Sequence, residues 1–327
     1  MGAKRRAGWM ICGALMTAAL AATLVIGEAY RRDMAHATAR LQGRSVVVRS
    51  PWGPIEYATI GQGPPVLVIH GSGGGFDQGL EMMGPLAAHG FRLIAPSRFG
   101  YLRSARPANA SPQVQADALA WLVARLGEQQ VVVAGGSAGA LTAMQFAIRH
   151  PQMTRAVVLI VPAAYAPDRL AGQNAMGGSL AEWLTLCLLR SDFAFWAVSR
   201  LYPAQMTRAV LATDPALVTG AAPEERARVR SVLTYILPVS RRAQGLADDT
   251  RWAGSPAPYR LDRITAPLLA VSAADDLYGT YASARFAAAG ARDGTFVGYP
   301  SGGHVLVGRQ TQMWDEVARW LAALERR

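Results

Sequence analysis

The chain has 327 residues, of which 51% are hydrophobic and 17% charged, so its composition excludes a disordered protein over most of the length and allows a large buried core. The formal net charge of +11 would suit nucleic acid binding. The arginines are scattered, however, Lys4 is the only lysine, and no basic helix or stacking motif accompanies them, so we expect no nucleic acid partner.

Residues 8–27 form an uncharged apolar run behind a basic start. In a helix these 20 residues match a bilayer core of about 30 Å. A secretory signal peptide shares this layout, with Ala19-Leu20-Ala21 as the candidate cleavage site, but its apolar core is usually about 7 to 15 residues. We therefore favour an uncleaved membrane anchor that places the body on the periplasmic or extracellular side, and a secreted protein if the segment is cleaved.

Strands and helices alternate through most of the remaining chain. Short β-branched runs that end in Gly or Pro predict strands, and apolar residues at helical spacing predict helices. The predicted strands are 45–50, 54–61, 66–70, 91–96, 130–134, 155–161, 266–276 and 294–300, and the predicted helices include 113–126, 280–289 and the C-terminal segment. This alternation predicts an α/β fold with a mostly parallel sheet flanked by helices, behind an antiparallel edge formed by the first two strands.

The alternation stops between Pro162 and Asp262, where apolar and aromatic residues recur at helical spacing only. We interpret this stretch as a helical insertion into one domain rather than as a second domain. The predicted division is a signal anchor (1–30), a charged stalk of helical or undecided structure (31–44), the first part of the core (45–161), a helical cap (162–262) and the second part of the core (263–327).

The stretch GGSAG, Gly135 to Gly139, lies between a predicted strand and a predicted helix. A serine at the apex of such a strand-to-helix turn presents its hydroxyl above the strand ends, and the tight backbone requires small neighbours. Ser137 is therefore the candidate nucleophile for acyl transfer. A plain glycine-rich turn is the alternative.

An acyl-transfer serine needs a base, a group that orients the base, and donors for the oxyanion. Among the five histidines we favour His304 as the base, because it follows a strand in the small-residue loop SGGH. His70, His89 and His150 have structural interpretations at the ends of a strand or helices. The orienting acid is expected just after the strand 266–276, where Asp275 and Asp276 both qualify.

The oxyanion donors are expected from backbone amides near the substrate. Ser72 and Gly73 lie in the glycine-rich loop HGSGGG after a predicted strand, and Ala138 follows the nucleophile. A phosphate-binding loop is the alternative, but the lysine of a P-loop and the dinucleotide spacing are both missing. We predict no cofactor and no metal.

The order Ser137, Asp276, His304, with HGSGGG and SRFGYLRS upstream, resembles the α/β-hydrolase superfamily over nearly the whole chain behind the anchor. The resemblance implies that Asp276 is the acid, three residues after the small residue that closes the late strand, with Asp275 as second choice. It also implies that the insertion is a cap domain. GGSAGALTAMQFAIRHP is similar to proline iminopeptidases and carbon–carbon bond hydrolases. Two departures are Ser72-Gly73 in place of Gly-Pro, and Ser97 in place of an acidic residue.

The leading hypothesis is a membrane-anchored serine hydrolase of esterase type that cleaves a small-molecule ester, of which a lipophilic ester is one form, through an acyl-enzyme on Ser137. The alternatives are a proline iminopeptidase, a carbon–carbon bond hydrolase, or a binding or scaffold module on the same fold. Aromatic and aliphatic residues of the cap are candidates for the substrate pocket, although most are expected in the cap's own core. They are Trp183, Leu184, Leu186, Phe193, Phe195, Trp196 and Tyr202.

Overall fold

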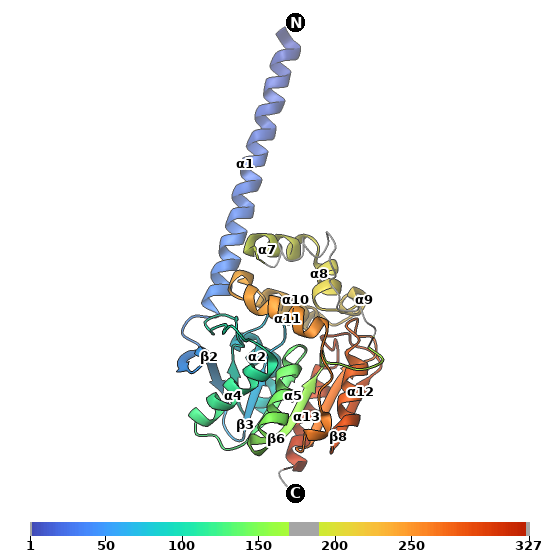
Figure 1. The fold of residues 1–327 in the computed structure, drawn as a ribbon. Coiled ribbons are helices and arrows are strands. Elements are labelled where there is room, and N and C mark those ends of the chain that lie inside the picture. The colour runs from blue at the N-terminus through green and yellow to red at the C-terminus, as the bar shows by residue number, and fades with distance from the viewer. Residues whose placement is uncertain (1, 170–189, 325–327) are drawn as a thin grey trace. The chain divides into compact units, whose positions relative to one another are not determined.

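The computed structural model describes residues 2–169 and 190–324, and the chain divides into two compact units, Met1–Gln42 and Gly43–Arg327. The described part of the first unit contains the long helix α1 (Gly2–Ala39; Figure 1), so most of the predicted stalk is helical. Residues Gly13–Ala39 are long and apolar enough to cross a membrane, and a signal sequence near the N-terminus would meet the same criterion. Cleavage and membrane orientation stay predictions.

The second unit is built on an eight-stranded sheet with the spatial order β1-β2-β4-β3-β5-β6-β7-β8. The strands are β1 (Val46–Ser50), β2 (Gly53–Ile60), β3 (Pro65–Ile69), β4 (Arg92–Pro96), β5 (Val131–Gly136), β6 (Thr154–Ile160), β7 (Leu268–Ala273) and β8 (Gly294–Tyr299). β2 is antiparallel to β1 and to β4, whereas every later pair is parallel. The predicted α/β fold with its antiparallel edge is confirmed.

Helices cover both faces of this sheet. They are α2 (Phe76–Met83), α3 (Pro85–Ala88), α4 (Pro112–Arg125), α5 (Gly139–Arg149), α12 (Thr280–Gly290) and α13 (Gln310–Leu324). Side chains alternate between the two faces of a strand. Leu67 and Ile69 therefore share one face, where they join the core cluster of α4, α5 and α12. Val68 and Ala95 point the other way and meet α2 at Gly79, with α3 and α13 beside it.

Every element that the structure describes between β6 and β7 is a helix, which agrees with the predicted break in the alternation. They form α7 (Asp192–Leu201), α8 (Pro203–Val210), α9 (Pro215–Thr219), α10 (Pro223–Tyr235) and α11 (Ala243–Gly254). Figure 1 shows these helices, in yellow to orange, gathered at one end of the sheet. We call α7 to α11 the cap helices; the domain boundaries at 162 and 262 stay predictions. Trp183, Leu184 and Leu186 lie outside the described residues.

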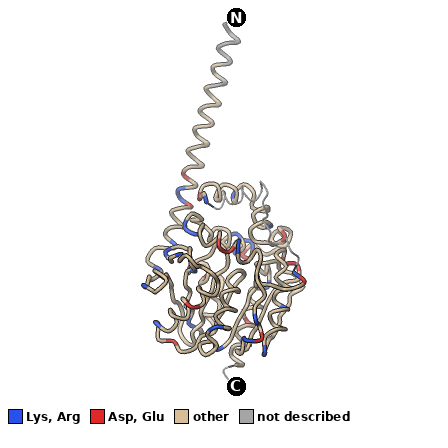
Figure 2. The backbone as a smooth tube through the Cα atoms, in the orientation of Figure 1, with Lys and Arg blue, Asp and Glu red and all other residues tan. Residues whose placement is uncertain are grey.

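Short 3-10 helices at Pro151–Met153, Val239–Arg241 and Leu261–Arg263 complete the described elements. In Figure 2 basic and acidic residues are interspersed around the second unit. Many of the arginines bind a neighbouring carboxylate, such as Arg106 with Asp248 and Arg149 with Asp117. The positive charge of the chain is therefore partly compensated pair by pair.

Candidate active site

Ser137 occupies a sharp turn between β5 and α5. Its backbone φ is +50°, a left-handed conformation that is uncommon for a residue with a side chain, and its N–H is held by the Ile160 carbonyl at 2.9 Å. The turn fits only because its neighbours are small. A Cβ on Gly139 would lie 2.3 Å from the Ile69 carbonyl oxygen, and one on Gly135 would lie 2.7 Å from the Ala143 methyl. The turn therefore fixes the hydroxyl of Ser137 at the carboxyl end of the parallel strands.

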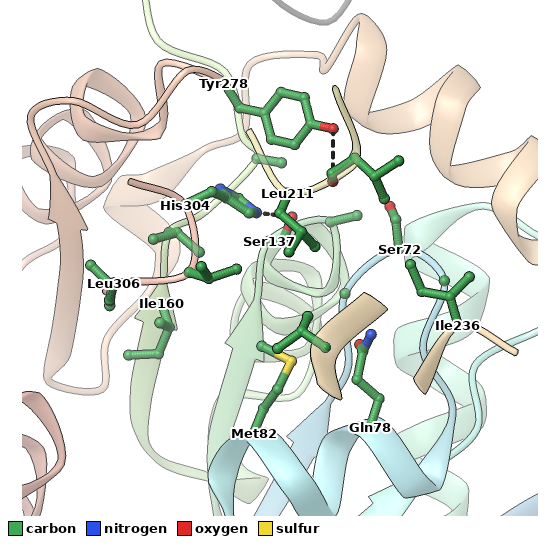
Figure 3. A pocket seen from close by; sticks show the side chains of 18 of the residues that line it. Ser72, Gln78, Met82, Ser137, Ile160, Leu211, Ile236, Tyr278, His304 and Leu306 are labelled. Carbon is green, nitrogen blue, oxygen red and sulfur yellow. Dashed lines mark hydrogen bonds between the residues drawn. The ribbon is translucent and has the colours of Figure 1, made fainter. Parts of the chain in front are cut away.

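A continuous hydrogen-bonded chain joins Ser137 to His304 and Asp276, and Figure 3 shows the bond between Ser137 and His304. The His304 imidazole lies with Nε2 2.9 Å from Ser137 Oγ and with Nδ1 2.8 Å from Asp276 Oδ2. The Asp276 side chain is fully buried, and the His304 side chain is about 10% exposed. The structure thus brings together three residues that are up to 167 positions apart in the sequence.

The buried Asp276 carboxylate is satisfied by several donors. Oδ1 accepts the Tyr278 N–H at 2.8 Å, and Oδ2 accepts the Thr280 hydroxyl as well as the bond to His304. Thr280 also contacts Ser272 Oγ at 2.8 Å, which ties the carboxylate to the end of β7. A fully hydrogen-bonded buried carboxylate has one fixed orientation, and it can therefore hold the imidazole in one tautomer.

Asp275 binds the backbone of the loop that carries His304, whereas Asp276 binds the imidazole. Its two carboxylate oxygens accept the N–H groups of Gly302 at 3.2 Å and Gly303 at 2.8 Å. Both glycines have positive φ, at 147° and 60°, so this loop has a backbone that most residues would not adopt. Asp275 therefore orients the loop that carries His304, whereas Asp276 contacts the imidazole itself.

Tyr278 packs edge-on against the His304 ring, with the ring centroids 5.0 Å apart. Its hydroxyl lies 3.3 Å from the carbonyl oxygens of Ala209 and Val210, at the end of cap helix α8. Burial, reinforced by the nearby Asp276 charge, raises the pKa of Tyr278 to about 12, so the hydroxyl stays protonated and can donate to these carbonyls. The tyrosine thus links the imidazole to the cap helices.

The three predicted oxyanion donors differ in their availability. In the described part of the chain the N–H groups of Ser72 and Ala138 have no hydrogen-bond partner. The Gly73 N–H, in contrast, donates to the Tyr101 hydroxyl at 3.3 Å. Ser72 and Ala138 both line the same cavity as Ser137, so their amides are the two available for an oxyanion.

His70, at the start of the glycine loop, is a structural residue. Its Nδ1 lies 2.7 Å from the Gly71 carbonyl, and its Nε2 accepts the Arg98 backbone N–H at 2.9 Å. One donating and one accepting nitrogen describe a neutral imidazole. Burial, together with the charge of Arg98, lowers the pKa of His70 well below its ordinary value, in agreement with this assignment. His70 therefore organises the loop and does not supply a base.

Ser97 stands where the resemblance led us to look for an acid, and Glu56 on β2 supplies the carboxylate there. The Ser97 hydroxyl donates to Glu56 Oε2 at 3.0 Å and accepts the Phe76 N–H at 3.1 Å. Arg103 Nε binds the other oxygen of Glu56 at 2.7 Å. A residue on a neighbouring strand thus connects the loop after β4 to the start of α2.

Ser137 opens into a cavity of about 460 Å³, a volume typical of small-molecule sites. The lining is mostly aliphatic, and Figure 3 shows Met82, Ile160, Ile236 and Leu306 around the serine. The cap helices contribute residues from α8, α10 and α11, which are Ala209, Val210, Arg228, Ser231, Val232, Leu246, Asp249, Thr250, Ala253 and Gly254.

The charged side chains of this lining have partners. Arg228 makes two bonds to Glu225, at 2.7 and 2.8 Å, and a third to the Val305 carbonyl. Burial opposes the charge of Glu225, but the bonds from Arg228 and the Gly308 amide outweigh it and lower the pKa of this carboxyl. Asp249 is paired with Arg98 at 2.5 Å.

The predicted aromatic residues of the cap do not line this cavity where they are described. Phe195 and Trp196 are buried among the cap helices, whereas Phe193 and Tyr202 are about half exposed. The expectation that most of them belong to the cap's own core holds for two of these four. Within residues 2–169 and 190–324, no group of three or more His, Cys, Asp or Glu side chains is arranged to hold a metal ion.

Comparison with known proteins places this chain in a family. The family described as alpha/beta hydrolase fold matches residues 64–308. The chain belongs to the α/β-hydrolase fold family. Among solved structures, an alpha/beta hydrolase fold protein from Nakamurella multipartita is 26% identical, with a TM-score of 0.66 over 84% of this chain and 98% of that one.

Two sequence relatives match only part of their own length, whereas one more solved structure matches in fold over its whole length. A 2-hydroxymuconate semialdehyde hydrolase of Pseudomonas sp. (strain CF600) is 32% identical over 41% of this chain and 49% of its own length. A 2-hydroxy-6-oxo-6-phenylhexa-2,4-dienoate hydrolase of Burkholderia cepacia is 26% identical over 50% and 56%. The chain thus spans about half the length of these relatives. A bacterial membrane phospholipase A is similar in fold over 98% of this chain and all of that one, with a TM-score of 0.67 and 20% identity.

Proposed function

We propose that this hydrolase cleaves uncharged, apolar carboxylic esters through an acyl-enzyme on Ser137. The observation that carries the proposal is the chain of hydrogen bonds from Asp276 through His304 to Ser137, which opens into a mostly aliphatic cavity. Two unpartnered amides, those of Ser72 and Ala138, lie on the same cavity. This combination provides a nucleophile, its base, and donors for a tetrahedral oxyanion.

The proposed reaction has two halves. His304 Nε2 takes the proton of the Ser137 hydroxyl while Oγ attacks the ester carbonyl carbon, and the amides of Ser72 and Ala138 bind the resulting oxyanion. Asp276 stabilises the imidazolium at Nδ1. The imidazolium then protonates the departing alkoxide, which leaves the acyl group on Ser137. Water repeats the sequence in the second half, releases the carboxylic acid and restores the serine.

The cavity favours an uncharged substrate over a carboxylate. In the described lining the cationic side chain is Arg228, and Glu225 already binds it through two hydrogen bonds. A buried carboxylate without a cation of its own would lose its hydration without compensation.

The names of the sequence relatives denote semialdehyde and dienoate substrates of carbon–carbon bond hydrolases. We therefore treat that reaction as the second candidate.

A membrane lipid ester is one form of the proposed substrate. Helix α1 contains a candidate membrane span, and an anchored hydrolase would meet lipophilic esters at a high local concentration. The mostly aliphatic cavity can accept an acyl chain. Membrane anchoring and export remain part of this proposal, and we place the body on the periplasmic or extracellular side.

The test uses the full chain in detergent, one probe of the nucleophile and a panel of substrates. A fluorophosphonate probe should label the wild type and leave Ser137→Ala unlabelled. Nitrophenyl esters of increasing acyl length should be hydrolysed, whereas matched esters whose acyl chain ends in a carboxylate should be poor substrates. Turnover of a 2-hydroxy-6-oxo-dienoate without ester hydrolysis would favour the second candidate, and turnover confined to proline arylamides would favour an iminopeptidase. An unlabelled wild type would favour the remaining alternative, a binding or scaffold module.

A further inference from the structure

The glycine loop that carries the Ser72 amide is bound by the side chains of Arg98, Tyr101 and Arg242. The Gly71 carbonyl accepts a bond from Arg98 Nη2 at 3.1 Å, and the Gly73 N–H donates to the Tyr101 hydroxyl at 3.3 Å. The Gly74 carbonyl accepts a bond from Arg242 Nη1. Three of the glycines that flank Ser72, namely Gly71, Gly73 and Gly74, are thus fixed through their backbone groups.

Both arginines of this arrangement form buried ion pairs across the boundary with the cap helices. Arg98 in the core binds both oxygens of Asp249 on α11, at 2.7 and 2.5 Å. Arg242, which immediately precedes α11, binds both oxygens of Asp77 on α2, at 3.1 and 2.9 Å. All four side chains are at most about 7% exposed. In one pair the core supplies the arginine and the cap helices supply the aspartate. In the other pair the cap side supplies the arginine and the core supplies the aspartate.

Tyr101 connects the Asp249 pair to the loop. Its hydroxyl donates to Asp249 Oδ2 at 2.5 Å while it accepts the Gly73 N–H. Burial, reinforced by the Asp249 charge, raises the pKa of Tyr101 well above its ordinary value, so the hydroxyl keeps the proton that this geometry needs. Burial opposes the charge of Arg98, but Asp249 outweighs it and raises the pKa of the guanidinium.

Close packing leaves α11 little freedom relative to the loop. A Cβ on Gly245 of α11 would lie 2.0 Å from the Tyr101 ring, and a Cβ on Gly75 would lie 2.8 Å from Arg242 Nη1. The Gly245 N–H also donates to the Gly100 carbonyl at 3.1 Å. A helix this close to the loop cannot move away without breaking both ion pairs.

We propose that Asp249 and Arg242 on the cap side are positioning residues of the oxyanion hole, acting through Arg98, Tyr101 and the backbone of the glycine loop. The inference rests on the proposed acyl-transfer function. Its physical reason is that an oxyanion donor stabilises the transition state only when it is already aimed at the developing charge. By occupying the neighbouring groups of Gly71, Gly73 and Gly74, the network leaves the Ser72 amide free and oriented.

The test compares two adjacent aspartates of α11. Asp249→Asn weakens the network around the glycine loop, whereas Asp248→Asn breaks the pair with Arg106, which also joins α11 to the core but does not reach the loop. For Asp249→Asn we expect kcat of ester hydrolysis to fall about 10- to 100-fold, with KM within about threefold, because part of the oxyanion stabilisation is lost. Asp248→Asn should stay within about twofold of the wild type.

A second readout separates positioning from general damage. An alkyl trifluoromethyl ketone adds to the serine and places its oxyanion in the same hole, so its affinity should fall by the same factor as kcat in Asp249→Asn. The pH dependence of kcat/KM should not change, because His304 and Asp276 are untouched. If Asp249→Asn does not fold, Tyr101→Phe decides, since it keeps the ion pair and removes only the hydroxyl; a fall of about tenfold in kcat is expected.

The outcomes for the two proposals differ. An active wild type in which Asp249→Asn, or Tyr101→Phe in its place, equals Asp248→Asn in kcat and in ketone affinity would overturn the positioning role alone. A wild type without ester turnover and without fluorophosphonate labelling of Ser137 would overturn the proposed function, and the positioning role with it.

Discussion

The two sides of Ser137 are held in different ways. On one side, Asp276, Thr280 and His304 come from a single stretch of the core after β7, and the bonds that orient the acid join residues at most 28 positions apart. On the other side, the glycine loop after β3 binds Arg98 and Tyr101, which are 27 and 28 positions away, but these two residues are held in turn by Asp249, about 150 positions further along the chain. Arg242 binds the loop directly across 168 positions.

This difference separates the proposed proton transfer from the proposed oxyanion binding. The acid–base side is built from core loops after β7 and β8. The oxyanion side additionally needs α11, so a change in the cap helices would reach the glycine loop before it reached His304. A variant of the acid–base side should therefore impair chemistry without unfolding, whereas a variant of the buried ion pairs should lower stability as well.

The largest effect is expected for His304→Ala. Removal of the proposed base should lower kcat about 10⁴- to 10⁶-fold, because the Ser137 hydroxyl loses its proton acceptor. Fluorophosphonate labelling should be lost in parallel, while the melting temperature should change little. The control is His89→Ala, since His89 lies about one third exposed at the end of α3, away from the cavity. Retained esterase activity in His304→Ala would show that another group acts as base.

The next effect distinguishes the two adjacent aspartates. Asp276→Asn should lower kcat about 10⁴-fold, because an amide no longer holds the productive tautomer of His304. Asp275→Asn should cost about tenfold, since it weakens only the bonds that orient the loop of Gly302 and Gly303. Both are measured as kcat on one nitrophenyl ester. A larger loss at Asp275 would contradict the assignment of the acid.

The Arg242→Met variant tests whether the buried ion pair with Asp77 contributes to the free energy of unfolding. The variant leaves Asp77 buried without its cation, and breaking such a pair costs about 3–5 kcal/mol in the free energy of unfolding. Urea unfolding of the full chain, followed by tryptophan fluorescence, measures the loss. The double variant Arg242→Met with Asp77→Leu should recover part of it, because no uncompensated charge remains. A single variant as stable as the wild type would show that the cap helices are not fastened at this point.

The smallest effect is expected at Asp117 on α4, which pairs with Arg149 and is not among the residues that line the cavity of Ser137. The hydrogen bond from Arg149 lowers the pKa of Asp117 despite partial burial, so its folded pKa lies below its unfolded value. The stabilisation is therefore present above about pH 4 and is lost as the pH falls through the folded pKa. Asp117→Asn should reduce stability at pH 7 by less than about 1 kcal/mol and leave it unchanged near pH 2. An equal loss at both pH values would exclude this titration as its source.

The sequence predicted most strands well because they are short apolar runs closed by Gly or Pro, which are local signals. The exception is β7, which is predicted over 266–276 and spans Leu268–Ala273, because no Gly or Pro marks its end. It missed α2 and α3, where Gly79, Gly84 and Pro85 interrupt the helical pattern. It also missed Tyr278 and Thr280 as neighbours of the acid, although both lie within four residues of Asp276. Nothing in the helical pattern of α11 distinguishes Asp249 from Asp248, because both have the same local context.

The sequence by itself indicated which segments form strands, the turn at Ser137 and His304 as the candidate base, since each depends on residues adjacent in the chain. The tertiary structure decided that Asp276 contacts the imidazole while Asp275 holds its loop, that the Ser72 amide is free while Gly73 is occupied, and that α8, α10 and α11 line the cavity. The physical reason is the separation along the chain of the residues that interact. A turn is fixed by local sterics, whereas a hydrogen bond or ion pair between distant residues exists only after the sheet and the cap helices have brought them together.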